Sequence, residues 1–243
     1  MNKLTTDTFF NGKIRVIQSR SGYRFSIDAV LLANSALPRE DGRVLDLGTG
    51  CGIIPLILAH RHPGIRIFGT EIQKGLADIA ILNVEANHMA GRITIFQEDM
   101  KNLRPSMTGG AADMVISNPP YRKPGSGRVN PDQERAIARH EIRATLSDLV
   151  QTARRMLRIS GHFVTIYPAD RMTDLLTQMR NADIEPKSFR TVHSGKHTEA
   201  KLILAEGIRG ARPGGIKIAP PLIIYDENGN YTDEVSEMFG KKE

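Results

Sequence analysis

Residues 43–52 read RVLDLGTGCG, in which a short apolar run leads directly into a turn with glycine at every second position. The run 43–47 is apolar almost throughout, as in a strand of a parallel sheet that is covered on both faces. Glycines let a turn adopt positive φ angles and approach a ligand closely, and the free amides at the start of the following helix favour polar or anionic groups. This stretch therefore predicts a strand–turn–helix unit whose turn binds a ligand.

The rest of the chain continues the alternation of strands and helices. Further strands are predicted at 65–71, 92–98, 113–118 and 162–167, and helices at 53–61, 74–87, 145–158 (ended by Gly161) and 169–181. The stretches SFRTVH (188–193) and AKLILAEG (200–207) are joined by a link too short for a parallel crossover, so they should pair antiparallel. The order predicts an α/β fold with a doubly wound, mostly parallel, seven-stranded sheet whose last strand is antiparallel.

We expect a single domain. Residues 41–243 should form the sheet and its helices and carry a C-terminal hairpin, with Asn228-Gly229 at the centre of its turn. Residues 1–40 should pack on this core as an N-terminal segment, in which FSIDAVLLA (25–33) predicts an amphipathic helix. No sheet pattern is recognised before residue 40.

Composition restricts the class of protein. The 243 residues include one cysteine, which excludes an internal disulfide and a cysteine-rich metal site. The N-terminus lacks the apolar segment of a signal peptide, and no run reaches the roughly 20 apolar residues of a membrane span, so we expect a cytoplasmic protein that binds neither membrane nor metal. Net charge is +6, and the excess of Lys and Arg is concentrated at 1–24, 121–160 and 187–217, which favours a polyanionic partner.

The turn after residue 47 departs from the dinucleotide fingerprint G-x-G-x-x-G, because Ile53 stands where the last glycine is required. It follows D-x-G-x-G-x-G instead, the pattern of S-adenosylmethionine sites. Glu71 ends the second strand at the distance expected for a carboxylate that accepts both ribose hydroxyls. After the third strand we favour Asp99 over Glu98 as the acceptor for an adenine amino group. The predicted cofactor-binding residues are Asp46, Gly48, Thr49, Gly50, Gly52, Glu71, Ile72, Asp99, Met100 and Asn118.

The fourth strand ends in SNPPY (117–121), where two prolines force the chain out of the sheet in a rigid, extended conformation. The motif resembles that of the N-P-P-Y amino methyltransferases, which belong to the S-adenosyl-L-methionine-dependent class I methyltransferases and modify an sp2 nitrogen. The resemblance implies that Asn118 and Pro119 accept the two N–H bonds of the target amine, that Pro120 keeps these acceptors rigid, and that Tyr121 stacks on a planar target.

Three stretches narrow the resemblance to the bacterial tRNA (adenine-N6)-methyltransferases, which modify the adenine 3′ of the anticodon of a valine tRNA. They are GYRFSIDAVLLA (22–33), the segment 118–141 and the tail GGIKIAPPLIIYDENGNYTDEV (214–235). The family implies a tRNA anticodon stem-loop as the partner. The basic residues Arg122, Lys123 and Arg128 directly follow the motif and suit the phosphates of such a loop.

Three other functions share features of this sequence. Protein glutamine methyltransferases acting on release factors also carry N-P-P-Y, although the loop after the motif here is basic and lacks their expected EP segment. A ribosomal RNA guanine-N2 or adenine-N6 methyltransferase with a duplicated domain is disfavoured, because no second sheet pattern precedes residue 40. A catalytically silent RNA-binding module is disfavoured by the intact Asp46, Glu71 and Asn118.

Overall fold

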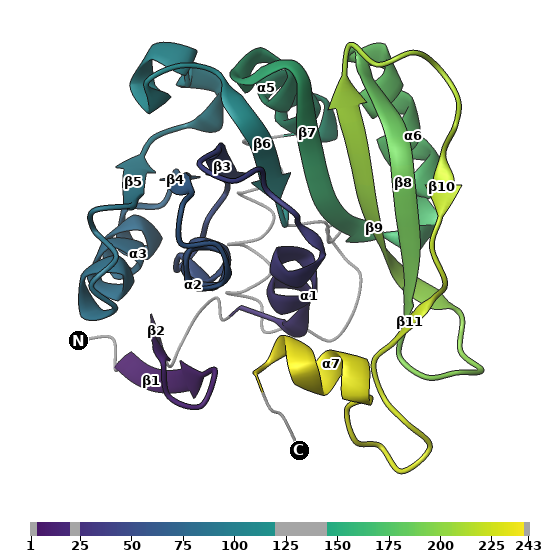
Figure 1. Cartoon of the computed structure of the whole chain (residues 1–243), viewed down its shortest axis with the longest axis horizontal. Helices are drawn as coiled ribbons and strands as arrows, with labels where there is room; N and C mark the ends of the chain where they lie inside the picture. The colour runs from purple at the N-terminus through teal and green to yellow at the C-terminus, as the bar shows by residue number, and fades with distance from the viewer. Residues whose placement is uncertain (1–3, 20–24, 120–144, 241–243) are drawn as a thin grey trace.

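The computed structural model describes residues 4–19, 25–119 and 145–240. Within these ranges, nine strands form one sheet that crosses the molecule (Figure 1). Its order is β5 (Ile93–Gln97), β4 (Arg66–Glu71), β3 (Arg43–Leu47), β6 (Ala112–Ser117), β7 (Leu157–Pro168), β9 (Ala200–Arg209) and β8 (Ile184–His193), with the short β10 (Lys217–Ile218) and β11 (Leu222–Ile223) both paired with β8.

The directions of these strands confirm the predicted topology. The pairs β5–β4, β4–β3, β3–β6 and β6–β7 are all parallel. By contrast, β9 runs antiparallel to both of its neighbours, β7 and β8. The sheet is therefore doubly wound and mostly parallel, as predicted. The two-residue strands β10 and β11 extend the sheet beyond the seven predicted strands. They were not predicted, because pairings this short leave no recognisable pattern in a sequence.

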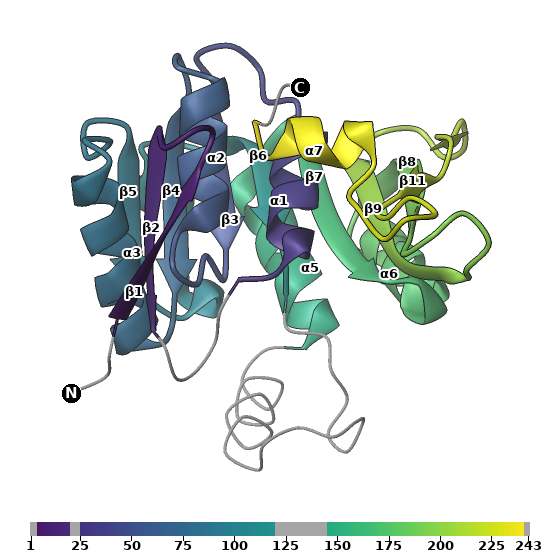
Figure 2. The same cartoon turned by 90° about the horizontal axis from the view of Figure 1, so that it is seen from below.

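Helices cover both faces of the sheet (Figure 2). One face carries α1 (Ile27–Ser35), α2 (Ile53–Arg61), α3 (Lys74–Ala86) and the short α7 (Asp233–Met238), and the other carries α5 (Leu146–Met156) and α6 (Met172–Asn181). Successive strand residues point to opposite faces, so Val44 belongs to the first core and Leu45 to the second. Both side chains are fully buried, which explains why the strand patterns are apolar almost throughout.

The junction of α5 and β7 differs from the prediction. The helix ends at Met156 and the strand begins at Leu157, so the strand starts five residues earlier than the predicted start at 162. Ser160 has a positive φ of 60°, and the β6–β7 pairing shifts register nearby. This bulge interrupts the strand pattern, and Gly161 lies within the strand rather than ending the helix.

Residues before position 40 also form a sheet, contrary to the expectation from sequence. Strand β1 (Leu4–Phe9) pairs antiparallel with β2 (Ile14–Ser19), and Ile14 and Val16 of β2 are buried in the first core. In β1, no residue is fully buried, so its apolar alternation is too weak to indicate a strand. A two-stranded hairpin is not a second domain, and it packs beside α3.

Candidate active site

The predicted site residues that the structure describes lie at the edge of the sheet where the parallel strands end. Glu71 is the last residue of β4, Asp46 is the second-last residue of β3, and Asn118 directly follows β6. Asp99 lies two residues after β5. The strand order therefore places Asp99, Glu71, Asp46 and Asn118 side by side in that sequence. In open α/β sheets this edge is where ligands bind.

The glycine turn between β3 and α2 has the geometry that the sequence predicts. Gly48, Gly50 and Gly52 have φ angles of 74°, 58° and 83°, which residues with a side chain rarely adopt. The N–H groups of Gly48 and Thr49 both donate to the carbonyl oxygen of Thr70 at 2.9 Å. The turn is therefore bound to the neighbouring strand β4 through its backbone.

Glu71 fixes the middle of the same turn. Its Oε2 atom accepts the N–H of Gly50 at 3.1 Å, and its Oε1 atom accepts the N–H of Gln73 at 2.9 Å. The residue is buried, yet each carboxylate oxygen keeps a further lone pair for another donor. Glu71 therefore both shapes the turn and retains acceptors for two hydroxyl groups. The adjacent Ile72 is partly exposed at the same edge.

Asp46 is the most unusual group of the site. It is fully buried, and neither carboxylate oxygen has a hydrogen-bond partner within the described part of the chain. Burial raises the pKa of Asp46 to about 7, the neighbouring Thr49 hydroxyl opposes the shift, and the negative charge of Glu71 adds to it. The Thr49 hydroxyl is itself buried without a partner there. A buried carboxylate without donors is costly, so this environment suits a ligand that brings a cationic or N–H donor group.

The acids after β5 have partners of their own. Oε1 of Glu98 accepts the N–H of Asp99 and the side-chain amide of Asn102, both at 2.9 Å, and these bonds lower the pKa of Glu98. Oδ1 of Asp99 accepts the N–H of Lys101 at 2.9 Å. Both acids are partly exposed at the edge, together with Met100. The preference for Asp99 over Glu98 therefore stays a prediction.

The exit of the chain from β6 is held on both sides by buried hydroxyl groups. Oγ of Ser117 donates to the carbonyl of Leu47, immediately before the glycine turn, and Oγ1 of Thr165 donates to the carbonyl of Ser117, each at 2.8 Å. Sequence reasoning selected neither Ser117 nor Thr165, although polar residues inside apolar strands are a usable signal. The partly exposed Asn118 follows, and its side-chain amide has no hydrogen-bond partner among the residues that the structure describes.

Several predicted residues lie outside the described ranges. These are Pro120, Tyr121, Arg122, Lys123 and Arg128. Pro119 is described and is partly exposed next to Asn118. The roles predicted for the five residues stay predictions from sequence.

The basic segment 187–217 does not form one surface. Lys187 donates to two backbone carbonyls at 2.6 Å, Arg190 forms an ion pair at 2.6 Å with an acid of α7, and Arg209 donates to the carbonyl of Leu157. These three cations therefore stabilise the fold. The basic residues of 187–217 are close together in the sequence because β8 and β9 are consecutive in the chain. The antiparallel pairing of these two strands spreads the same residues along the length of the strands.

Three of the four remaining cations of this segment lie at opposite edges of the sheet, and the fourth, Lys217, pairs midway along β8. Lys196 follows the end of β8, and Lys201 lies at the start of β9, so both are exposed at the same edge as Asn118. Arg212 follows the end of β9 and lies at the opposite edge. Ten-residue strands span about 30 Å, so the two groups are well separated.

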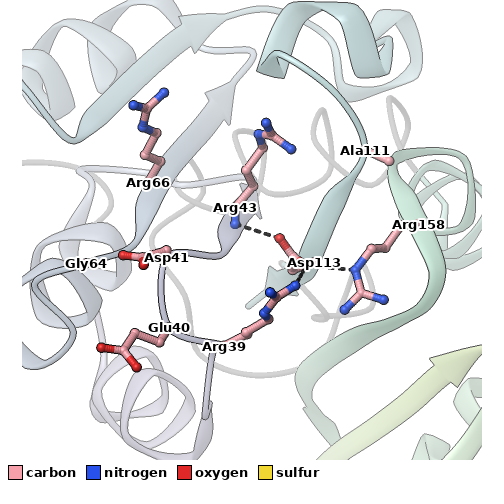
Figure 3. Close-up of a pocket in the computed structure, with 9 residues that line it drawn as sticks. All are labelled: Arg39, Glu40, Asp41, Arg43, Gly64, Arg66, Ala111, Asp113 and Arg158. Carbon is pink, nitrogen blue, oxygen red and sulfur yellow. Dashed lines mark hydrogen bonds and ion pairs between the residues drawn. The ribbon is translucent and has the colours of Figure 1, made fainter.

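The opposite edge also holds a cavity of about 650 Å³ at the starts of β3, β4 and β6 (Figure 3). Its centre is Asp113, which accepts the N–H of Arg43 at 2.9 Å and the Nε–H of Arg158 at 2.7 Å. Arg39 lies 4.0 Å from the same carboxylate. Together with two further acids, Asp113 offsets most of the positive charge of the four arginines that line the cavity. The cavity is therefore lined by an ion-pair network at the starts of the strands, and none of its lining residues is a predicted site residue.

The described residues contain neither a membrane-spanning helix nor a cluster of metal ligands. No helix there has the length and apolar character needed to span a membrane. No group of three or more His, Cys, Asp or Glu side chains in the same residues is arranged to hold a metal ion.

Comparison with known proteins identifies relatives of the whole chain. The family model for the methyltransferase small domain matches residues 21–182. The tRNA1(Val) (adenine(37)-N6)-methyltransferase of Porphyromonas gingivalis (strain ATCC 33277) is 32% identical over 95% of this chain and 92% of its own length. The enzyme of the same name from Aeromonas hydrophila is 26% identical over 93% of this chain and 92% of its own length.

Solved structures share the fold. A protein from Agrobacterium tumefaciens described as a predicted O-methyltransferase superposes with a TM-score of 0.67 at 20% identity, over 87% of this chain and 94% of that chain. Geranyl diphosphate C-methyltransferase from Streptomyces coelicolor, solved with S-adenosyl-L-homocysteine, gives a TM-score of 0.52 at 13% identity over 74% of this chain and 78% of that chain.

Proposed function

This chain belongs to the methyltransferase small domain family and to the tRNA1(Val) (adenine(37)-N6)-methyltransferases within it, and on that premise we propose that it methylates the exocyclic N6 amine of adenine 37 in a valine tRNA. The protein is an S-adenosyl-L-methionine-dependent methyltransferase, as predicted from its glycine turn. A tRNA substrate also supports the expectation that it works in the cytoplasm.

The residues of the edge fit this cofactor. The buried Asp46 carboxylate has no donor among the described residues, and the amino group of the cofactor supplies one. Glu71 keeps one free lone pair on each oxygen, which suits two ribose hydroxyls. Asp99 and Met100 lie on the far side of Glu71, where the adenine is expected. When bound, S-adenosyl-L-methionine supplies an electrophilic methyl group.

Asn118 and Pro119 act on the substrate. The lone pair of an adenine N6 amine is delocalised into the ring, so the amine is a poor nucleophile. The side-chain oxygen of Asn118 and the carbonyl of Pro119 accept its two N–H bonds, orient the lone pair, and stabilise the positive charge that develops on nitrogen. The buried bonds of Ser117 to Leu47 and Thr165 hold this exit rigid, so the acceptors are in place before the base arrives.

Tyr121 and the basic residues after it bind the RNA in this proposal. An aromatic ring beside the amine acceptors can stack on an extruded base. The phosphates of the anticodon loop then meet Arg122, Lys123 and Arg128, and the exposed Lys196 and Lys201 contribute from the same edge. Arg212, at the opposite edge, takes no part.

The observation that carries the proposal is the position of Asn118 at the end of β6, next to the strand that leads into the glycine turn. Asn118→Ala should lower the single-turnover rate of methyl transfer to unmodified valine tRNA by roughly two to three orders of magnitude, as when other transition-state hydrogen bonds are lost. Binding of tRNA and of S-adenosylhomocysteine should change little. Full activity of the variant, or methyl transfer to glutamine of a release factor instead of to RNA, would overturn the proposal.

A further inference from the structure

The side-chain amide of Asn83 on α3 is fully buried and makes three hydrogen bonds. Its Oδ1 atom accepts the N–H of Ile17 at 2.6 Å, and its Nδ2 atom donates to the carbonyl of Ile17 at 3.0 Å and to the carbonyl of Cys51 at 2.8 Å. Ile17 belongs to β2 of the N-terminal hairpin, and Cys51 belongs to the glycine turn. One side chain therefore connects two segments that are far apart in sequence.

Asn87, one helical turn later, makes the same contact with the hairpin. Its Oδ1 atom accepts the N–H of Arg15 at 2.8 Å, and its Nδ2 atom donates to the carbonyl of Arg15 at 2.7 Å. Residues four apart on a helix match the spacing of residues two apart on a strand, so the two amides pair with the edge of β2 that β1 leaves open. The third bond of Asn87 goes back to the carbonyl of Asn83 within the helix, and not to the glycine turn.

The Cys51 carbonyl is one of the backbone groups that hold the conformation of the glycine turn. It lies between Gly50, whose N–H binds Glu71, and Gly52, whose N–H donates to the Thr49 carbonyl at 2.9 Å. A Cβ atom on Gly52 would lie 3.3 Å from the Cβ of Ala80, which shows how closely α3 packs on the turn. The Cys51 carbonyl shares one planar peptide unit with the Gly52 N–H, so fixing the carbonyl fixes the direction of that N–H within the turn.

We infer that Asn83 is a positioning residue that couples docking of the N-terminal hairpin (4–19) to the conformation of the glycine turn. The inference rests on the cofactor assignment in the proposed function, but not on the identity of the RNA. Because coupling between two binding events is reciprocal, cofactor binding should strengthen docking of the hairpin as much as the docked hairpin strengthens cofactor binding. Asn83 acts through the turn and does not touch the substrate.

Two variants separate this role from a merely structural one. Asn83→Ala should weaken binding of S-adenosylhomocysteine about tenfold by calorimetry, because the turn loses the hydrogen bond at Cys51. Asn87→Ala removes the same kind of contact with the hairpin but leaves the turn intact, so its affinity should stay within about twofold of wild type. Both variants should lower the melting temperature, by roughly 2–8 °C, since each loses bonds between α3 and β2. Equal affinities in the two variants would overturn the inference.

Hydrogen exchange supplies a second readout that needs neither tRNA nor activity. Saturating S-adenosylhomocysteine should slow deuterium uptake of residues 4–19 in wild type and in Asn87→Ala, but not in Asn83→Ala. If Asn83→Ala does not fold, the wild-type comparison decides, because unchanged uptake on ligand binding contradicts the coupling. If the wild-type protein does not methylate valine tRNA but S-adenosylhomocysteine still slows deuterium uptake of residues 4–19, only the proposed function is refuted.

Discussion

Replacing Asp46 by asparagine should stabilise the cofactor-free protein while abolishing cofactor binding. Burial raises the pKa of this carboxyl from its usual 3.8 to about 7. At about 1.36 kcal/mol per unit, holding the carboxylate in the folded protein costs on the order of 4 kcal/mol at neutral pH. The buried amide of asparagine itself lacks a partner there and costs about 1–3 kcal/mol, so the net gain should be about 1–3 kcal/mol.

The dependence on pH gives the prediction a definite sign. A raised pKa means that the folded protein binds more protons than the unfolded chain between about pH 4 and 7, so stability falls in this window as pH rises. Thermal melts of cofactor-free protein should show Asp46→Asn above wild type by roughly 3–10 °C at pH 7. The advantage should disappear as the pH is lowered towards 4, because Asp46 is then neutral in the folded protein and no buried charge is held.

Asp113→Asn is the matched control at the opposite edge of the sheet. Partial burial raises the pKa of Asp113, but the hydrogen bonds from Arg43 and Arg158 and the charges of Arg158 and Arg39 outweigh it and lower the pKa. This carboxylate therefore stabilises the fold above its unfolded pKa, and the control variant should melt below wild type at pH 7. A melting temperature of Asp46→Asn below wild type at pH 7, or normal binding of S-adenosylhomocysteine by that variant, would refute the reasoning about Asp46.

Two further predictions concern the cofactor and the RNA. Glu71→Ala should weaken binding of S-adenosylhomocysteine by about ten- to a hundredfold in calorimetry, because the variant lacks both the ribose contacts and the hydrogen bond to Gly50. An unchanged affinity would show that Glu71 does not bind the cofactor. Replacing Lys196 and Lys201 together by alanine should weaken tRNA binding and reduce its salt slope by about 1–2, measured as the dissociation constant at several salt concentrations. The double replacement of Arg66, at the start of β4, and Arg212 has the same charge change at the opposite edge. It should have little effect, so equal losses in the two pairs would contradict the assignment.

Much of the site is predictable because it is local in sequence. The glycine turn and Asn118 each follow a strand, and Glu71 is the last residue of one. The parallel sheet brings these strand ends to one edge without any further information. The spacing of residues along the chain is then sufficient to predict which side chains meet.

Other features depend on contacts that the sequence does not encode locally. The bond between Asn83 and Ile17 joins residues 66 positions apart, and no periodicity indicates that a helix amide pairs with a strand edge. The missing donor at Asp46 is a property of its surroundings rather than of its motif. The basic segment 187–217 looked continuous only because β8 and β9 are consecutive, and their antiparallel pairing divides it between two edges.

The measurement that tests the central claim most directly is mass spectrometry of valine tRNA after incubation with the protein and isotopically labelled S-adenosyl-L-methionine. Digestion to nucleosides should yield labelled N6-methyladenosine, and digestion to oligonucleotides should place the label at adenine 37, the position in the name of the relatives. A transcript with guanine in place of that adenine should stay unlabelled. Label on another nucleoside, label that persists in the substituted transcript, or label found on release-factor glutamine while the tRNA stays unmodified would contradict the account.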